Sequence, residues 1–372
     1  MMPHCPLAEI ARKFVIQPQV APAAVVALAW AGAAGFEFAQ GAAFKDERCS
    51  ADARAFFDLA SVTKSFLAVT VARLVQRGRL SFDTPLQDLL PEARGSLTGS
   101  ASVLLLLSHR AGLVAHRDLF APLLAGAPFE QAAAIRAAVH GRRPECHGPA
   151  PASGYPPLYS DLGFALLGLA IERLEQLPLD QVVDREVCAP LELELEVGSA
   201  RMLRARGTGF AARCMPTETV PSRGGEVRGL VHDENAWALS GHGLSGHAGL
   251  FGTALGLARF GAALLEAEAQ AAQRRPSAWL DSSILAPLLE ERPGGTLRAG
   301  FDGKSADQSS AGTLAGRRSF GHLGFTGTSF WCDPDGARVL VLLTNRVCPT
   351  RNNPRIRAAR PAVNDALYAF YA

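Results

Sequence analysis

The sequence predicts an α/β (α+β) protein in which an antiparallel sheet, flanked by N- and C-terminal helices, is built from both ends of the chain, with a mostly helical lobe inserted between them. Strand-like patterns occur near both termini, whereas the middle of the chain combines helical patterns with long Gly/Pro loops. We therefore expect a single domain over residues 1–372, with a sheet lobe at about 1–88 and 251–372 and a helical lobe at about 89–250. A ligand cleft is expected where the two lobes meet.

The N-terminal region is predicted to form a short amphipathic helix, Leu7–Phe14, and then a strand pair, Ala24–Trp30 and Gly35–Ala43, joined by a turn. A second interpretation is an export signal, because the apolar run follows two basic residues. Gln and Pro residues between those charges and the apolar run favour the strands. We therefore expect a cytoplasmic protein, and a periplasmic or secreted one if residues 1–35 act as an export signal.

Further elements are expected along the rest of the chain. Ser61–Gln76 has the apolar spacing of a helix, with Gly78 as its stop signal. Val103–Leu107 is compatible with a strand or a buried helix, and Arg201–His232 has an irregular pattern. The remaining predictions are loops at Lys45–Arg54 and His140–Pro157, a helix at Leu162–Leu174, strands at Arg317–His322, Thr328–Asp333 and Arg338–Thr344 with a tight turn at Asp335-Gly336, and a closing helix at Ala358–Tyr371.

Composition excludes several classes of function. The 372 residues carry a formal charge of +2 with no long basic run, and only 7% are aromatic, so a nucleic-acid partner is not expected. Beyond the N-terminal region, no stretch reaches the roughly 20 apolar residues of a membrane helix, so no membrane partner is expected. The seven cysteines lack CxxC and metal-ligand spacings, which indicates mostly free thiols, although Cys332 and Cys348 could pair across a hairpin.

The strongest chemical signal is Ser61-Val62-Thr63-Lys64 at the start of a predicted helix. Residues three apart share a helical face, so the hydroxyl and the amine lie within reach of each other. A serine hydroxyl needs a nearby base to become a nucleophile, and a lysine can serve if its pKa falls. The helix N-terminus favours the anionic oxygen that develops during attack. Ser61 is therefore the predicted nucleophile and Lys64 its predicted base.

A second signal is Tyr159-Ser160-Asp161, directly before a helix. Ser160 or Asp161 could simply cap that helix, and the tyrosine could be a packed aromatic. The functional interpretation places Tyr159 beside Lys64, where the ammonium would depress the phenol pKa and make it a proton relay.

A third signal is His322-Leu323-Gly324-Phe325-Thr326-Gly327, near a strand. Glycines allow the backbone to approach a substrate closely. A strand edge with free N–H groups could supply half of an oxyanion hole, and such a donor contributes on the order of 100-fold to 1,000-fold in rate.

Histidines and acids around His232, Asn235 and His247 raise the possibility of a zinc site. The surrounding glycines indicate a flexible loop, and neither HExxH nor another compact ligand set is present. We expect no metal and no cofactor, and instead assign these three side chains to hydrogen bonds within the loop or to substrate.

Taken together, these segments resemble the serine β-lactamase and penicillin-recognising enzyme superfamily, in particular class C β-lactamases and related esterases, D-aminopeptidases and DD-peptidases. The resemblance extends from about residue 57 to 346. It rests on the phrases Phe57-Asp58-Leu59-Ala60-Ser61-Val62-Thr63-Lys64, Leu106-Leu107-Ser108-His109-Arg110-Ala111-Gly112-Leu113, Tyr159-Ser160-Asp161-Leu162-Gly163, Gly246-His247-Ala248-Gly249-Leu250-Phe251 and Leu343-Thr344-Asn345-Arg346.

The resemblance implies a β-lactamase-like fold and an acyl-enzyme on Ser61. Lys64 and Tyr159 would share the role of base, and the backbone N–H groups of Ser61 and Phe325 would form the oxyanion hole. The other expected substrate-binding residues are His322, Gly324, Asp161, His247 and Asn345. The implied substrate is a small ester, an amide or a peptidoglycan-like fragment, and the oligomeric state stays open.

Two positions depart from the family pattern. Asp161 replaces the asparagine of Tyr-x-Asn, and an ionised carboxylate donates no hydrogen bond. His322-Leu323-Gly324 replaces Lys-Thr-Gly, and histidine carries little charge at neutral pH unless its pKa is raised. Ester or amide hydrolysis is therefore expected over efficient β-lactam hydrolysis. The alternatives are a catalytically silent binding or regulatory protein on the same fold and a metal-dependent hydrolase using the region from His232 to His247.

Overall fold

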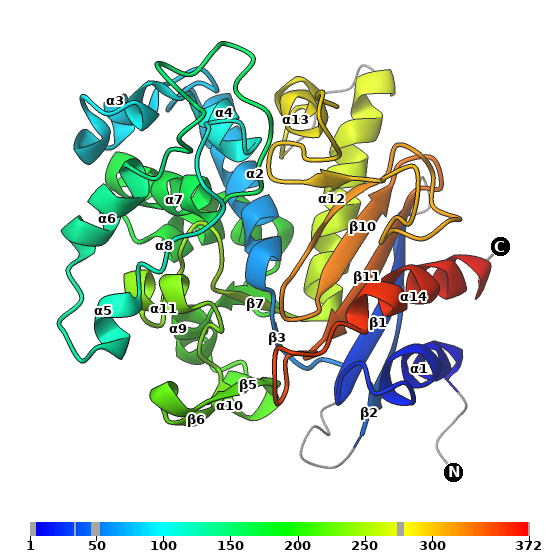
Figure 1. Cartoon of the computed structure of the whole chain (residues 1–372). Coiled ribbons are helices and arrows are strands. Elements are labelled where there is room, and N and C mark those ends of the chain that lie inside the picture. The colour runs from blue at the N-terminus through cyan, green and yellow to red at the C-terminus, as the bar shows by residue number, and fades with distance from the viewer. Residues whose placement is uncertain (1–4, 33–34, 46–52, 274–278, 371–372) are drawn as a thin grey trace.

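The computed structural model describes residues 5–32, 35–45, 53–273 and 279–370. Its main sheet has six antiparallel strands in the order β2-β1-β11-β10-β9-β8 (Figure 1). Strands from the two ends of the chain pair directly, with Val26 of β1 opposite Leu342 of β11. The prediction of an antiparallel sheet built from both termini is therefore confirmed. The strands are β1 (Ala23–Gly32), β2 (Gly35–Phe44), β8 (Asp302–Gly303), β9 (Phe320–Leu323), β10 (Ser329–Asp333) and β11 (Arg338–Thr344).

Strand β1 is buried on both faces, which explains why its sequence is a continuous apolar run instead of an alternating one. Val25 and Ala27 belong to the core between the sheet and the helical lobe. Val26 and Leu28 belong to a second core on the opposite face, because successive side chains of a strand point to opposite sides. The apolar stretch that also resembled an export signal thus forms a central strand.

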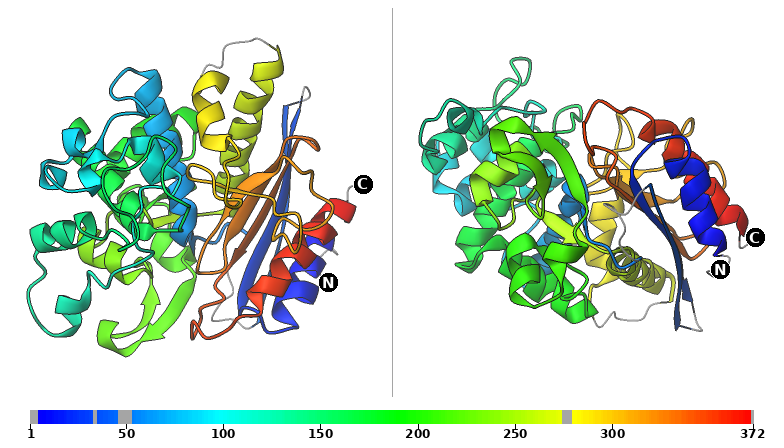
Figure 2. Two further views of the ribbon diagram at one scale, coloured as in Figure 1. Left: turned by 45° about the horizontal axis from the view of Figure 1, so that its top comes forward. Right: turned by 90° about the horizontal axis from the view of Figure 1, so that it is seen from below.

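Helices cover both faces of the sheet. On one face α1 (Pro6–Ala11), continued by a wider helical turn at Arg12–Ile16, lies beside α14 (Ile356–Phe370) (Figure 2). On the other face α12 (Ala254–Gln273) packs against β1, β10 and β11, with α13 (Ser282–Leu289) against α12. The N- and C-terminal helices predicted from the sequence therefore flank the sheet as expected.

The middle of the chain forms the helical lobe and two small β structures. Strands β3 (Phe57–Asp58), β7 (Leu250–Gly252) and β4 (Val197–Ser199) form a three-stranded sheet, and β5 (Pro216–Val220) pairs with β6 (Gly225–Arg228). The helices are α2 (Thr63–Gln76), α3 (Leu86–Leu89), α4 (Val103–Leu107), α5 (Ala121–Leu124), α6 (Gln131–Val139), α7 (Asp161–Glu175), α8 (Leu179–Val183), α9 (Ala200–Ala205), α10 (Phe210–Arg213) and α11 (Glu234–Ser240). Short helical turns occur at Ala60–Val62, Pro91–Ala93, Thr98–Ser100, Asp184–Cys188, Ala189–Leu191 and Pro221–Arg223.

Several sequence expectations need correction or completion. Arg201–His232 is not irregular, because it contains most of α9, together with α10 and the β5–β6 hairpin. Each of these elements is only four to six residues long, too short to show a period, and Gly224 and Gly225 with positive φ turn the hairpin. Val103–Leu107 is a buried helix. The predicted β1–β2 turn, the loop at Lys45–Arg54 and the end of the closing helix lie partly outside the described residues.

Within the described ranges, no helix combines the length and apolar character needed to cross a bilayer. Cys146, Cys188, Cys214 and Cys332 are buried free thiols, so the considered pairing of Cys332 with Cys348 does not form.

Helix α2 lies between the sheet and the helical lobe and is almost entirely buried. Phe66 stacks on Phe260 of α12 at 4.0 Å between ring centroids.

Phe66→Ala is expected to lower the free energy of unfolding by about 3–5 kcal/mol, because it removes this packing and leaves a cavity. Phe36→Ala, at a position 41% exposed, is the matched control and is expected to cost under about 1 kcal/mol. Urea unfolding of both variants checks this; equal losses would contradict it.

Candidate active site

The turn that carries Ser61 is held by a buried carboxylate. Ala60 has a φ of 46°, in the left-handed region, and its N–H donates to Asp58 Oδ1 at 2.8 Å. The other oxygen of Asp58 accepts from the His232 N–H at 2.7 Å. Burial raises the pKa of Asp58, and these hydrogen bonds oppose that rise. Asp58 therefore joins the Ser61 turn to the loop before α11.

Lys64 is buried one turn into the helix and reaches three acceptors. Its Nζ lies 2.9 Å from Ser61 Oγ, 2.7 Å from Asp161 Oδ1 and 3.3 Å from the His247 carbonyl oxygen. The predicted juxtaposition of hydroxyl and amine is therefore present in the structure. The ammonium also lies 4.8 Å from the centre of the Tyr159 ring, which brings the first two sequence signals together.

The charge state of this cluster differs from the sequence expectation. Burial lowers the pKa of Lys64, but the Asp161 carboxylate and Tyr159 outweigh it, so that the pKa is raised. Burial raises the pKa of Tyr159 more than Lys64 lowers it, so the phenol is not acidified as predicted. Burial disfavours the Asp161 carboxylate, yet Lys64 and His116 hold its pKa well below the usual range. At neutral pH the resting site therefore contains an ammonium, a carboxylate and a neutral phenol.

Two neutral histidines border the Tyr159 ring. The ring centroids of His109 and His322 lie 4.6 Å and 6.2 Å away. Burial, reinforced by the Lys64 charge, lowers the pKa of each histidine to about 3. His109 Nδ1 accepts from the Ser160 N–H at 3.0 Å, and His322 Nδ1 lies 2.9 Å from the Leu323 carbonyl oxygen. His322 thus supplies no charge to the site.

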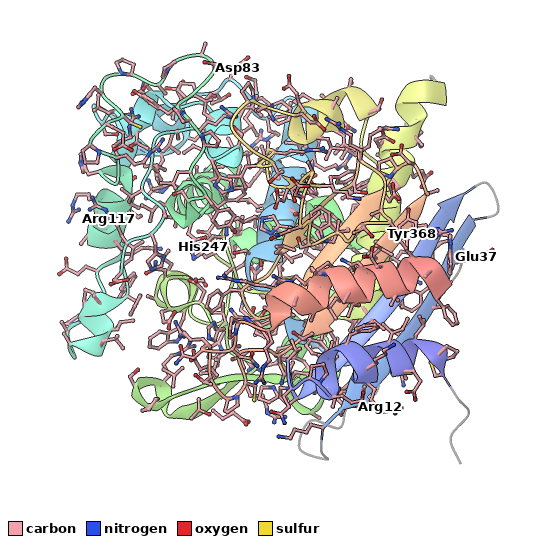
Figure 3. The ribbon with its side chains drawn as sticks, turned by 45° about the vertical axis from the view of Figure 1, so that its right-hand side comes forward. Arg12, Glu37, Asp83, Arg117, His247 and Tyr368 are labelled. Atoms are coloured by element: carbon pink, nitrogen blue, oxygen red, sulfur yellow. The ribbon has the colours of Figure 1, made fainter. Side chains whose placement is uncertain are left out.

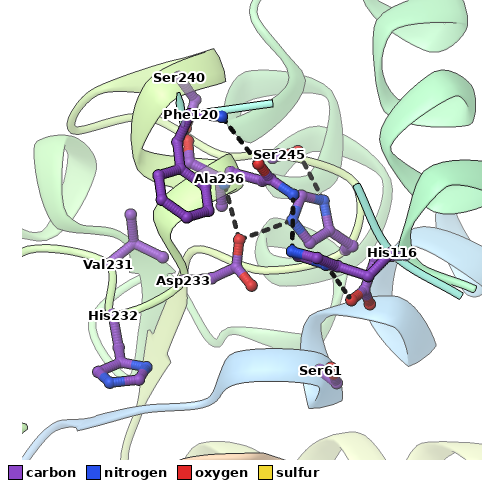
Figure 4. A network of polar contacts seen from close by, with 12 residues as sticks. Ser61, His116, Phe120, Val231, His232, Asp233, Ala236, Ser240 and Ser245 are labelled. Atoms are coloured by element: carbon purple, nitrogen blue, oxygen red, sulfur yellow. Dashed lines mark hydrogen bonds and ion pairs between the residues drawn. The ribbon is translucent and has the colours of Figure 1, made fainter. Parts of the chain in front are cut away.

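A polar network that includes His116, Asp233 and Ser245 lies near Ser61 (Figure 4). His116 Nδ1 lies 3.6 Å from Asp161 Oδ2, so that Asp161 lies between this imidazole and the Lys64 ammonium. The His247 side chain is buried, with Nε2 2.9 Å from Asp233 Oδ1 and Nδ1 3.0 Å from Ser245 Oγ. Figure 3 places His247 at the junction of the helical lobe and the sheet. Its imidazole does not line the cavity; its carbonyl oxygen contacts Lys64.

Asn345 and Asn235 also make structural hydrogen bonds. Asn345 Oδ1 accepts from the Ala23 N–H at 2.9 Å, and its Nδ2 donates to the Pro216 carbonyl oxygen at 3.0 Å. Asn345 therefore ties β1 to β5 and lies outside the cavity lining. Asn235 Nδ2 donates to the Arg117 carbonyl oxygen at 2.7 Å, a hydrogen bond between loops.

The third sequence signal forms a tight turn next to Ser61. Thr326 Oγ1 donates to the Asp58 carbonyl oxygen at 2.6 Å, and Thr328 Oγ1 donates to that of Leu59 at 3.1 Å. A Cβ at Gly324 would clash with Thr328 Oγ1 and lie 2.6 Å from the Leu59 carbonyl oxygen, so only glycine permits this approach. The segment bearing Phe325 is thereby held against the chain that leads into Ser61.

A cavity of about 790 Å³ opens over this site. Six of the residues singled out from the sequence line it: Ser61, Tyr159, Asp161, His232, Gly324 and Phe325. Sequence reasoning did not assign roles to other residues of the cavity wall, namely His116, Asp118, Asp233, Arg346, Arg351, Arg357 and Arg360. The available signal was weak: the quoted phrases ended at Arg346, and single charged residues outside a motif have no diagnostic spacing. Among the described residues, no three His, Cys, Asp or Glu side chains are grouped to hold a metal ion.

Comparisons with known proteins agree with this fold. A protein from Salmonella agona named "Putative D-alanyl-D-alanine carboxypeptidase" is 27% identical over 317 residues, covering 81% of this chain and 71% of that protein. A class C beta-lactamase from Rhodobacter sphaeroides superposes with a TM-score of 0.66 at 17% identity, covering 98% of this chain and 99% of the other.

The structure of EstCE1, described as a hydrolase with promiscuous acyltransferase activity, gives a TM-score of 0.69 at 20% identity, with 98% of each chain covered. The family model described as Beta-lactamase matches residues 14–364. That match spans nearly the whole sequence, and the chain belongs to the beta-lactamase family.

Proposed function

We propose that the protein is a serine hydrolase that cleaves an ester or amide through an acyl-enzyme on Ser61. The observation that carries this proposal is the 2.9 Å contact between Lys64 Nζ and Ser61 Oγ at the wall of the cavity. Nucleophilic serines require such a base within hydrogen-bonding distance. The names of the relatives, which include a carboxypeptidase and a hydrolase, support the same reaction class.

In the proposed reaction, Ser61 Oγ attacks the carbonyl carbon as its proton passes to Lys64 or Tyr159, whichever has lost its own proton. The backbone N–H groups of Ser61 and Phe325 are the proposed donors to the oxyanion. Collapse of the tetrahedral intermediate expels the leaving group, which takes up the proton held by the base. Water then attacks the acyl-enzyme with the same base accepting its proton, which releases the acid and restores Ser61.

The proposed substrates are small esters, D-amino-acid amides or peptides, and peptidoglycan-like fragments. Efficient β-lactam hydrolysis is disfavoured because the neutral His322 and the apolar Leu323 stand where the family pattern has Lys and Thr. A second candidate is a catalytically silent binding protein. The observation that favours it is the Lys64–Asp161 ion pair at 2.7 Å, since this pair keeps the base protonated at rest.

Covalent labelling separates the two candidates. A fluorophosphonate is expected to modify the native protein at one site, which peptide mass spectrometry should locate at Ser61. Ser61→Ala and the urea-unfolded wild type are the controls, and neither should be labelled. Absence of labelling between pH 7 and pH 10 would contradict the hydrolase and favour the silent protein.

A further inference from the structure

Four arginines gather on one wall of the cavity that contains Ser61. Arg346 and Arg351 follow β11, and Arg357 and Arg360 lie in the first turns of α14. Arg351 is neutralised by Glu218 and Glu234, each at 2.5 Å. In the described parts of the chain, the other three arginines form no ion pair with a carboxylate. The wall therefore carries positive charge that the protein itself does not balance.

Arg360 is the most deeply buried of these cations, with 8% of its surface exposed. Its Nη2 donates to the carbonyl oxygens of Gly324 and Thr328 at 2.7 and 2.9 Å, whereas its buried Nε has no hydrogen-bond partner. Burial, together with the Arg346 charge, lowers the pKa of Arg360 to about 9, which still leaves a cation at neutral pH. A buried cation without a counter-ion is costly, and an anion bound in the cavity would offset that cost.

Arg346 is held rigidly beside it. Its Nε donates to the Phe325 carbonyl oxygen at 2.8 Å, and its Nη1 donates to those of Arg351 and Asn353 at 3.0 Å. The guanidinium also lies 4.5 Å from the centre of the Phe325 ring. Arg357, by contrast, is exposed at the cavity edge. Fixed cations lose little freedom when an anion binds, which favours affinity.

Carboxylates line other parts of the cavity wall. They are Asp118, Asp161, Asp233 and Glu234, of which Asp161 is paired with Lys64 and Glu234 with Arg351. An anionic group would be attracted to the arginines and not to these carboxylates, which gives a substrate a preferred direction across Ser61. The positive charge of the cavity wall does not come from β9, because His322 of that strand is neutral.

We propose that Arg346, Arg357 and Arg360 form a subsite for an anionic group, a carboxylate or a phosphate, carried by the substrate of Ser61. This inference rests on the proposed function and adds the substrate class to it. Arginine recognises both anions through paired N–H donors. The subsite adjoins the Gly324–Phe325 turn, because Arg360 and Arg346 both donate to carbonyl oxygens of that turn.

Matched ester pairs test the subsite on either side of the scissile bond. One pair is mono-p-nitrophenyl glutarate and p-nitrophenyl hexanoate; the other is 3-carboxyphenyl acetate and phenyl acetate. In at least one pair, kcat/KM for the anionic ester is expected to exceed that for the neutral ester by about tenfold or more. Competition by succinate and by inorganic phosphate against a neutral ester then distinguishes a carboxylate subsite from a phosphate subsite.

Arg357→Gln is expected to reduce that anionic preference about tenfold, because the subsite loses one of its three cations. The matched control is Arg355→Gln, two residues earlier, which removes the same charge. Arg355 is exposed, donates to the Gln19 carbonyl oxygen and does not line the cavity, so the preference should persist.

Two outcomes would overturn the subsite but not the hydrolase. In the first, turnover depends on Ser61 but neither pair shows an anionic preference. In the second, the preference is present but Arg357→Gln leaves it intact. If no ester is turned over, the proposed function fails, and the subsite is tested by thermal unfolding with succinate and with phosphate. Stabilisation of the wild type that is lost in Arg357→Gln but kept in Arg355→Gln would then support the subsite. Equal responses of all three proteins would reject it.

Discussion

Ser61→Ala is expected to lower kcat/KM for ester hydrolysis by at least about 10³-fold, because the variant cannot form an acyl-enzyme. The substituted side chain lies at the cavity wall, where its hydroxyl contacts the Lys64 amine and Tyr159, so the fold should tolerate the change. Hydrolysis of p-nitrophenyl acetate and p-nitrophenyl butyrate, compared with D-alanine p-nitroanilide and nitrocefin, measures this loss and ranks the substrate classes.

Ser65→Ala is the matched control for this experiment. Ser65 lies four residues further along the same chain, is buried, and donates through Oγ to the Gly300 carbonyl oxygen at 2.7 Å. Losing that hydrogen bond should lower the free energy of unfolding by about 1 kcal/mol and leave kcat/KM nearly unchanged. Wild type and Ser61→Ala hydrolysing the whole panel at equal rates would eliminate the acyl-enzyme mechanism.

Asp161→Asn is expected to move the acidic limb of the pH–rate profile to a pH about one to three units lower. The Asp161 carboxylate raises the pKa of Lys64 and also that of Tyr159, so its removal frees either candidate base at lower pH. At a pH below the limb, the deprotonated fraction of the base rises about tenfold each time its pKa falls by one. The weaker base that results should also lower the alkaline plateau. The measurement is kcat/KM between pH 5.5 and 10.

The control for charge is Asp118→Asn, which removes one carboxylate from the same cavity. Asp118 is exposed and pairs with His116 at 3.3 Å without contacting Lys64, so the limb should move by less than about half a pH unit. A profile that does not move in Asp161→Asn would show that neither Lys64 nor Tyr159 is the kinetic base. If the profile moves, Tyr159→Phe distinguishes Lys64 from Tyr159 as the base. The acidic limb persists in Tyr159→Phe only if Lys64 accepts the proton.

The same substitution has a consequence for stability with a defined sign. Without Asp161, Lys64 remains buried with no counter-ion, which should cost about 3–5 kcal/mol of unfolding free energy at neutral pH. Burial then lowers the folded-state pKa of Lys64 below its unfolded value. The loss of unfolding free energy should therefore become smaller as the pH rises and the lysine becomes neutral. Urea unfolding at pH 7 and pH 10 checks this expectation.

The two departures from the family pattern, Asp161 and His322, both change the charge of the site. With aspartate in place of the asparagine, the site at rest holds a protonated lysine, and with histidine in place of the lysine, β9 contributes no charge. The proposed hydrolase would therefore be most active under alkaline conditions or with a substrate that perturbs the ion pair. An anionic substrate held by Arg346, Arg357 and Arg360 would meet a cavity whose positive charge comes from the C-terminal segment.

Much of the fold followed from local patterns. The apolar runs of β1 and β11, the helix after Ser61 and the turn at Asp335-Gly336 are set by the period and turn preferences of neighbouring residues. The short elements within Arg201–His232 were not predicted, because four to six residues are too few to display a period and are stabilised by tertiary contacts. Phe210 of α10, for example, packs edge-on against Phe251 of β7.

The sequence by itself determined the family pattern, the strands near both termini and the pairing of Ser61 with Lys64, because these depend on residues close together in the chain or on motifs with fixed spacing. Only the tertiary structure decided the charge state of the site. The distances from Lys64 to Asp161, from Asp161 to His116 and from Arg360 to its neighbours depend on segments far apart in sequence. Burial and Coulomb interactions follow from those distances, and no local pattern of residues encodes them.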